Sequence, residues 1–290
     1  MNNFLSFFIE PMTYDFMQRA LLMSVLIAVV CSTFSCFLIL KGWSLMGDAV
    51  AHAILPGLGV ATLIGIPIAI GALFAGIFCA VVTGYIKENC RVKEDAVMGI
   101  MFSGMFALGL ILLTMIETDV HLLHVLFGSV LGITNADLFE AGSIAIICST
   151  IMLIKRKDIM LYCFDPAHAA VIGLPIRLLH LGLLIFLALT IVSSLKAAGI
   201  ILVIAMLIAP GAIGFTLART LDNMLAIALS VSVVSCIIGT ILSFHLDAAT
   251  APLIVVIQAT FFVLAMTVGR RQSTEKRLQN AAQSANKGLT

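Results

Sequence analysis

Nine long apolar segments constrain this chain more than any other feature of its sequence. Each has 17 to 22 residues, close to the roughly 17–25 residues that a helix needs to cross a bilayer. Within lipid the backbone must satisfy its own hydrogen bonds, which a helix does inside one segment. We therefore predict an all-α polytopic membrane protein with about eight or nine transmembrane helices, some short or broken. The segments are 19–40, 48–64, 68–86, 96–116, 138–154, 178–195, 200–217, 224–244 and 252–268.

Composition narrows the function classes. Hydrophobic residues make up 61% of the chain and charged residues 11%, which is outside the range of soluble domains. The net charge of +1 says nothing about nucleic acid, and no nucleic-acid partner is expected. The sequence contains no Gly-x-x-x-x-Gly-Lys-Ser/Thr phosphate-binding motif and no His-Glu-x-x-His protease motif. We therefore predict that the chain is not an enzyme and that any nucleotide-driven step needs a partner.

The lysines and arginines predict the orientation of the chain. With the C-terminus in the cytoplasm, 14 of the 16 lie on the inner side, as the positive-inside rule requires. We expect residues 1–18 to form an outer N-terminal segment, 19–269 the transmembrane domain and 270–290 a polar cytoplasmic tail, disordered or a frayed helix. The inner positions are Lys41, Lys87, Arg91, Lys93, Lys155, Arg156, Lys157, Arg177, Arg219, Arg270, Arg271, Lys276, Arg277 and Lys287.

The second apolar segment carries a carboxylate and an imidazole, Asp48 and His52, among glycines and alanines. Residues four apart share one face of a helix, and ionisable groups at membrane depth are costly enough to mark a pathway or a site. One oxygen and one nitrogen ligand suit manganese, iron or zinc, whereas copper(I) prefers thiolates and thioethers. We predict a metal site at this pair; a buried hydrogen-bonded pair that joins two helices is the structural alternative.

Two outer positions are weaker candidates for metal ligands. His121 and His124 are three residues apart in an acidic loop, where they could form an entry funnel for metal or a docking surface for a delivery protein. His245 and Asp247 follow the eighth segment and could form an outer gate or a secondary coordination point. For both pairs, an ordinary solvated loop is the alternative interpretation.

Prolines within the apolar segments predict helix breaks. Pro56 has no backbone donor and should kink or end the helix that carries Asp48; broken helices are where transporters tend to bind substrate. Pro210 and Gly211 should end the seventh segment on the inner side, with a short amphipathic helix after it near Arg219 and Asp222.

Over residues 15–270 the chain resembles the membrane-spanning permease of bacterial ABC importers for divalent metals, the manganese, zinc and chelated-iron family, and most of all its iron/manganese branch. The resemblance lies in several motifs. They are Gly47-Asp48-Ala49-Val50-Ala51-His52-Ala53, Glu94-Asp95-Ala96 followed by residues 99–109, Leu126-Phe127-Gly128-Ser129-Val130-Leu131-Gly132, Phe164-Asp165-Pro166, and the stretches 199–210 and 243–252.

The resemblance implies partners and roles that the residues alone do not. Two permease subunits, identical or paralogous, would form the pathway in the bacterial inner membrane. A cytoplasmic ATPase would bind them and an extracytoplasmic metal-binding protein would deliver the ion. Asp48 and His52 match the family's metal ligands. The stretch from Pro210 and Gly211 to Arg219 and Asp222 matches the element that couples to the ATPase.

The transported ion would then be manganese, iron or zinc, and no permanently bound cofactor is expected. The alternative function is a secondary transporter in which Asp48 and His52 relay protons. It predicts metal uptake driven by a proton gradient without an ATPase.

Overall fold

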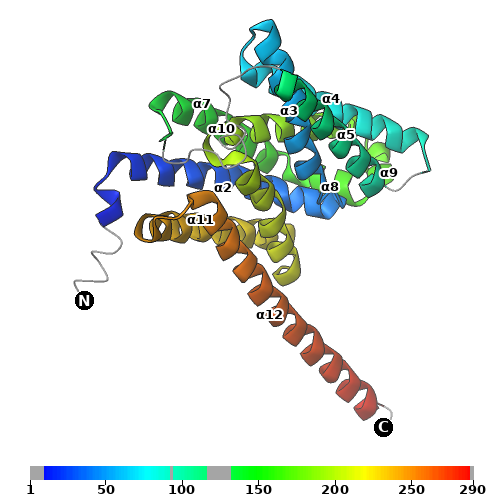
Figure 1. Cartoon of the computed structure of the whole chain (residues 1–290). Helices are drawn as coiled ribbons and strands as arrows, with labels where there is room; N and C mark the ends of the chain where they lie inside the picture. The colour runs from blue at the N-terminus through cyan, green and yellow to red at the C-terminus, as the bar shows by residue number, and fades with distance from the viewer. Residues whose placement is uncertain (1–9, 92–93, 116–131, 288–290) are drawn as a thin grey trace.

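The computed structural model describes residues 10–91, 94–115 and 132–287, and all the regular structure in these ranges is helical (Figure 1). The order of helices follows the order of apolar segments, with two short helices between the fifth and sixth. The bounds are α2 Asp15–Lys41, α3 Met46–Ile64, α4 Ile68–Asn89, α5 Glu94–Met115, α7 Asn135–Ile154, α8 Arg156–Phe164, α9 Pro166–Val171, α10 Ile176–Leu217, α11 Leu221–Leu246 and α12 Thr250–Lys287.

Nine stretches of helix in the described ranges are long and apolar enough to cross a membrane, which confirms the predicted fold class. Two of them are the halves of α10 on either side of Gly199. The boundaries differ most at the ends of the chain. Helix α2 begins at Asp15 instead of residue 19, and α12 continues through residues 270–287 and projects away from the bundle (Figure 1). The tail up to Lys287 is thus a continuation of the last helix.

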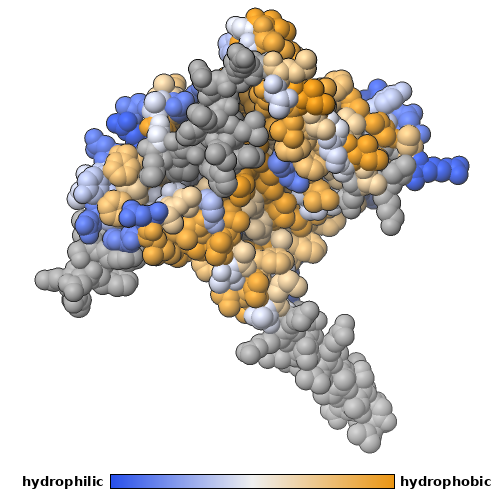
Figure 2. Space-filling view, viewed as in Figure 1, coloured by the Kyte–Doolittle hydropathy of each residue, from blue (hydrophilic) through white to orange (hydrophobic). Residues whose placement is uncertain are grey.

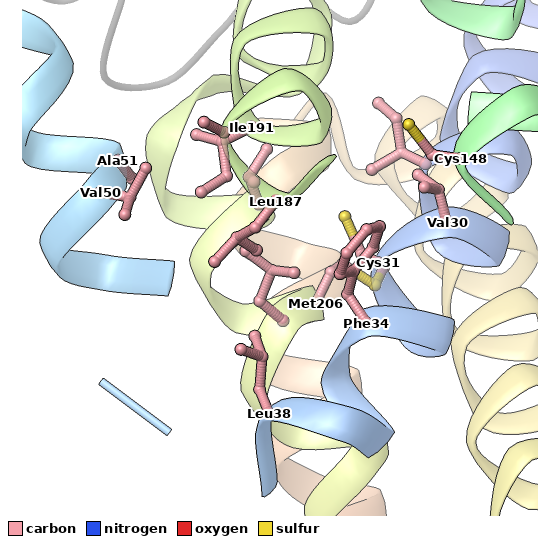
Figure 3. Packing of buried hydrophobic residues seen from close by; sticks show 14 of the residues in the cluster. Val30, Cys31, Phe34, Leu38, Val50, Ala51, Cys148, Leu187, Ile191 and Met206 are labelled. Carbon is pink, nitrogen blue, oxygen red and sulfur yellow. The ribbon is translucent and has the colours of Figure 1, made fainter. Parts of the chain in front are cut away.

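Helix α2 is the centre of the bundle. It packs against α7, α8, α10 and α11, and 72% of the residues in its most apolar stretch are buried. Phe34, Cys31 and Leu38 of α2 meet Leu187 and Met206 of α10 in the core (Figure 3). Because lipid tails are as apolar as these side chains, close packing, rather than exclusion of water, holds such helices together.

A second group of helices, α3, α4 and α5, is joined by contacts between backbones. Gly57 of α3 faces Gly71 of α4 so closely that a Cβ on either would collide with the other's carbonyl oxygen. A Cβ on Gly109 of α5 would lie 2.8 Å from the nitrogen of Pro56. These glycines let three helix backbones approach closely around the segment that carries Asp48 and His52.

Pro56 does not end its helix, because α3 continues from Met46 to Ile64, whereas a kink at this residue stays a prediction. The missing amide of a proline is tolerated in membrane helices when neighbouring helices pack tightly around it, and α5 does so here through Gly109. The marked break is instead at Gly199 in α10, where φ is 72° and ψ is 168°. Glycine is the residue that adopts this conformation without steric cost.

The predicted helix end at Pro210 and Gly211 is also wrong, because both residues lie inside α10, which runs on to Leu217. Ser35 of α2 hydrogen-bonds the backbone on both sides of the proline. Its hydroxyl accepts a 2.8 Å hydrogen bond from the Gly211 amide and donates one of 3.2 Å to the Ile208 carbonyl. A hydroxyl from the neighbouring helix thus ties this part of α10 to α2. Residues 218–220 link α10 directly to α11, without the expected short amphipathic helix.

The surface of the described chain matches a protein surrounded by lipid. Hydrophobic residues cover most of the face seen in Figure 2, and hydrophilic residues gather at its two lateral ends. Large apolar side chains such as Ile100 and Phe74 are 70% and 69% exposed, far more than a soluble protein would leave open over so many positions. With nine candidate spans, this surface describes a multi-pass membrane protein.

Candidate metal site

The start of α3 places the carboxylate of the site. A turn at Gly42, whose φ is 76°, reverses the chain after α2, and Trp43 packs into the core at 2% exposure. Helix α3 then begins at Met46, which puts Asp48 in its first turn. The N-terminal end of a helix carries partial positive charge, which interacts favourably with an acidic side chain there. The position of Asp48 is therefore set by a buried turn at the start of α3.

Asp48 and His52 meet as their spacing predicts. The Nε2 atom of His52 lies 3.3 Å from Oδ1 of Asp48, and the two side chains are 17% and 33% exposed, respectively. The pair is therefore neither sealed in packing nor fully open. The surrounding helices hold both side chains on one side, and the other side is left uncovered by this chain.

The separation of the two atoms suits a shared metal ion. Bonds of about 2.1 Å to each ligand, at angles between octahedral and tetrahedral, place two ligand atoms roughly 3.0–3.4 Å apart. The observed 3.3 Å falls in that range without any change in α3, which carries both residues. Within the part of the chain that is described, no cluster of three or more His, Cys, Asp or Glu side chains is arranged to hold a metal. Asp48 and His52 would therefore supply two ligands to an ion, and the remaining ligands would have to come from outside this pair.

Two aromatic residues of α5 complete the surroundings of His52, and the motif analysis did not single them out. Phe102 and Phe106 contact the imidazole with ring centroids 4.8 and 5.2 Å away. They are one turn apart on one helix face. This i, i+4 aromatic pair within a glycine-rich span was the available signal, but a spacing within α5 cannot reveal which residue of α3 it faces.

The other metal-ligand candidates lie apart from this pair. His245 is in the last turn of α11, and Asp247 caps that helix in a left-handed conformation, with φ of 49°. Neither joins Asp48 and His52 in a metal-binding cluster among the described residues. His121 and His124 fall outside the described ranges, so their predicted role stays a prediction.

The inner residues gather around a surface cavity of about 430 Å³. The carboxylate of Asp222, in the first turn of α11, accepts a 2.8 Å ion-pair contact from Nη1 of Arg156 on α8. Arg219 lines the same cavity, whereas Pro210 and Gly211 lie deeper within α10. The link between α10 and α11 and the short helix α8 thus form one surface, which we predict to lie on the inner side; the sequence did not indicate its connection through Arg156.

Comparison with known proteins places this arrangement in a family. The model of the ABC 3 transport family matches residues 13–269. The chain belongs to the ABC 3 transport family. The matched residues include all nine candidate membrane spans, and only the continuation of α12 after Gly269 lies outside the match. The match confirms the resemblance drawn from the motifs.

Individual members of the ABC 3 transport family are similar along most of their length. The chelated iron transport system membrane protein YfeD of Yersinia pestis is 60% identical over 266 residues, 92% of this chain and 90% of that protein. The manganese transport system membrane protein MntB of a Synechocystis species is 50% identical over 261 residues, 89% of this chain and 84% of that protein. Among solved structures, PsaBC from Streptococcus pneumoniae in complex with Fab has a TM-score of 0.81 at 31% identity, covering 90% of this chain and 95% of that chain.

Proposed function

We propose that this chain is the permease subunit of an ATP-driven importer of divalent transition metals in a bacterial inner membrane. The expected cargo is manganese or iron, with zinc as a third candidate. The observation that carries the proposal is the Asp48–His52 pair, 3.3 Å apart on a membrane-spanning helix, in a chain of the ABC 3 transport family. Relatives named for transport of chelated iron and manganese support this choice of cargo.

The geometry suggests how an ion would pass. An ion from the outer side would exchange part of its water shell for Oδ1 of Asp48 and Nε2 of His52. Two protein ligands leave most of the coordination sphere to water or to the same pair on a second permease subunit. Incomplete coordination suits a transport site, because a fully enclosed ion would leave slowly. The ligand types do not select manganese over zinc, since affinity follows the Irving–Williams order.

Three kinds of partner follow from this proposal. A second permease subunit, identical or paralogous, would complete the pathway, and an extracytoplasmic metal-binding protein would deliver the ion. A cytoplasmic ATPase would supply the energy, and the C-terminus would lie on its side of the membrane. The inner surface formed by α8 and the α10–α11 link is the proposed contact for the ATPase. Arg219, Asp222 and Arg156 provide charged groups there.

Charge reversal at Arg219 should weaken association with the ATPase. Arg219→Glu places a negative charge next to Asp222 at the rim of the inner cavity, so a partner that approaches with acidic side chains is repelled. The loss expected for one exposed charge contact is roughly fivefold in affinity, or about 1 kcal/mol. Co-purification of tagged ATPase with the permease measures it. Arg91→Glu, an exposed inner residue after α4, is the matched control, and equal recovery of ATPase with both variants would argue against this placement.

Reconstitution distinguishes the proposed function from a proton-coupled carrier. Liposomes that contain the two permease subunits and the ATPase are loaded with ATP, and the binding protein with Mn²⁺ is added outside. We expect uptake that requires ATP and stops when the ATPase is omitted. Uptake driven by a proton gradient alone, without the ATPase, would instead identify a secondary transporter.

A further inference from the structure

The imidazole of His52 is held by two aromatic rings. The rings of Phe102 and Phe106 meet it edge-on, at interplanar angles of 63° and 88°. The two phenyl rings are themselves stacked, 5.9 Å apart at 29°. Edge-to-face contacts of this kind are directional and restrict rotation of the rings involved. Helix α5 thus sets the orientation of a side chain that belongs to α3.

The two nitrogens of His52 have different surroundings. Nε2 lies 3.3 Å from the Asp48 carboxylate. Nδ1 is buried and has no hydrogen-bond partner among the described residues. A histidine that binds a metal usually donates its second N–H to a carboxylate, a carbonyl or water, and loss of such a partner typically lowers metal affinity by roughly 10–100-fold. Phe102 and Phe106, which contact the imidazole ring, carry no oxygen or nitrogen atom that could accept a hydrogen bond from it, and an N–H–π contact is weak.

We propose that Phe102 and Phe106 are positioning residues that direct Nε2 of His52 toward the ion and deny Nδ1 a strong acceptor. This deepens the proposed function, on which it rests. The consequence is a site with a fixed geometry and a modest affinity for the metal ion. An ion enters a preorganised pair of ligands, but the imidazole lacks the outer partner that would make it a stronger ligand. The aromatic pair thereby favours release of the ion over retention.

Glutamine substitutions test whether the lack of a hydrogen-bond acceptor at Nδ1 of His52 lowers the metal affinity. Phe102→Gln and Phe106→Gln each place an amide oxygen, which can accept a hydrogen bond, next to the imidazole ring of His52. We expect at least one of them to lower the Kd for Mn²⁺ by about tenfold or more, and to lower both kcat and KM of ATP-driven uptake because release slows. Equilibrium binding of Mn²⁺ to the purified complex of permease and ATPase gives the Kd, and uptake into liposomes gives the rates.

Leucine substitutions test the positioning separately. Phe102→Leu and Phe106→Leu keep apolar bulk but remove the flat ring, so Nε2 is no longer held toward Asp48. We expect the Kd for Mn²⁺ to rise several-fold. Phe139, which is 79% exposed on α7, provides matched Phe→Leu and Phe→Gln controls that should leave the Kd unchanged.

Three results separate this inference from the proposed function. If the four variants of Phe102 and Phe106 bind Mn²⁺ with the wild-type Kd while Asp48→Ala loses binding, the aromatic residues have no positioning role and the metal site stands. If the glutamine variants bind Mn²⁺ more weakly, as the leucine variants should, the hypothesis that a missing acceptor at Nδ1 limits the affinity is rejected. If Asp48→Ala and His52→Ala also bind normally, the metal site itself is misplaced.

Discussion

Alanine at Asp48 or His52 should abolish ATP-driven metal uptake while the complex still assembles. Each substitution removes one of the two side chains that we propose as metal ligands. Loss of an outer-sphere partner alone costs roughly 10–100-fold in metal affinity, so loss of a direct ligand should exceed about 100-fold. Radiometal uptake into liposomes measures the effect, and size-exclusion chromatography verifies assembly.

Two further variants make this result specific to the pair. Asp48→Asn keeps the size of the side chain and removes its charge, so it should bind the ion far more weakly if the carboxylate is a ligand. Asp15→Ala removes an exposed carboxylate at the other end of the preceding helix and should transport normally. Wild-type uptake by both alanine variants of the pair would overturn the assignment of the site.

Leucine at Gly57 should prevent α3, α4 and α5 from packing and cause the second large loss. A Cβ at this position collides with the carbonyl of Gly71 and lies 2.7 Å from Cβ of Ala75, so the two backbones must separate. Overpacking of this kind costs about 1–3 kcal/mol and sometimes more. Because α3 carries Asp48 and His52, uptake should fall together with stability.

Thermal unfolding of the purified permease in detergent measures the stability change. Gly104 is the matched control, because a Cβ there has no heavy atom within 4 Å. Gly104→Leu should therefore unfold near the wild-type temperature. Equal unfolding temperatures for Gly57→Leu and Gly104→Leu would show that the close crossing of α3 and α4 does not contribute to the stability of the permease.

The sequence predicted the membrane helices and the central pair because both depend on short-range patterns. Nine apolar lengths predict nine spans, and an i, i+4 spacing brings Asp48 and His52 to one helix face. Domain boundaries, orientation and the coupling role of the inner residues are further predictions that the arrangement of helices does not itself test.

The features that the sequence did not reveal all depend on contacts between distant helices. Pro210 was expected to end a helix, and its neighbour Gly211 is instead hydrogen-bonded by Ser35, 176 positions earlier. Phe102 and Phe106 enclose His52 from another helix. No local pattern specifies which faces of two helices meet, so such partners emerge only from the packed bundle.

The uninterrupted passage of α3 through Pro56 has an electronic consequence. An interior helical carbonyl normally accepts a hydrogen bond from the amide four residues later. Four residues after His52 that amide is missing, because position 56 is proline. The main-chain oxygen of His52 therefore lacks the helical hydrogen bond that neighbouring carbonyl oxygens accept from the amide four residues later. The residue that carries the ring nitrogen of the proposed site thus also contributes a patch of negative potential from its main-chain oxygen, directed toward the next turn of α3.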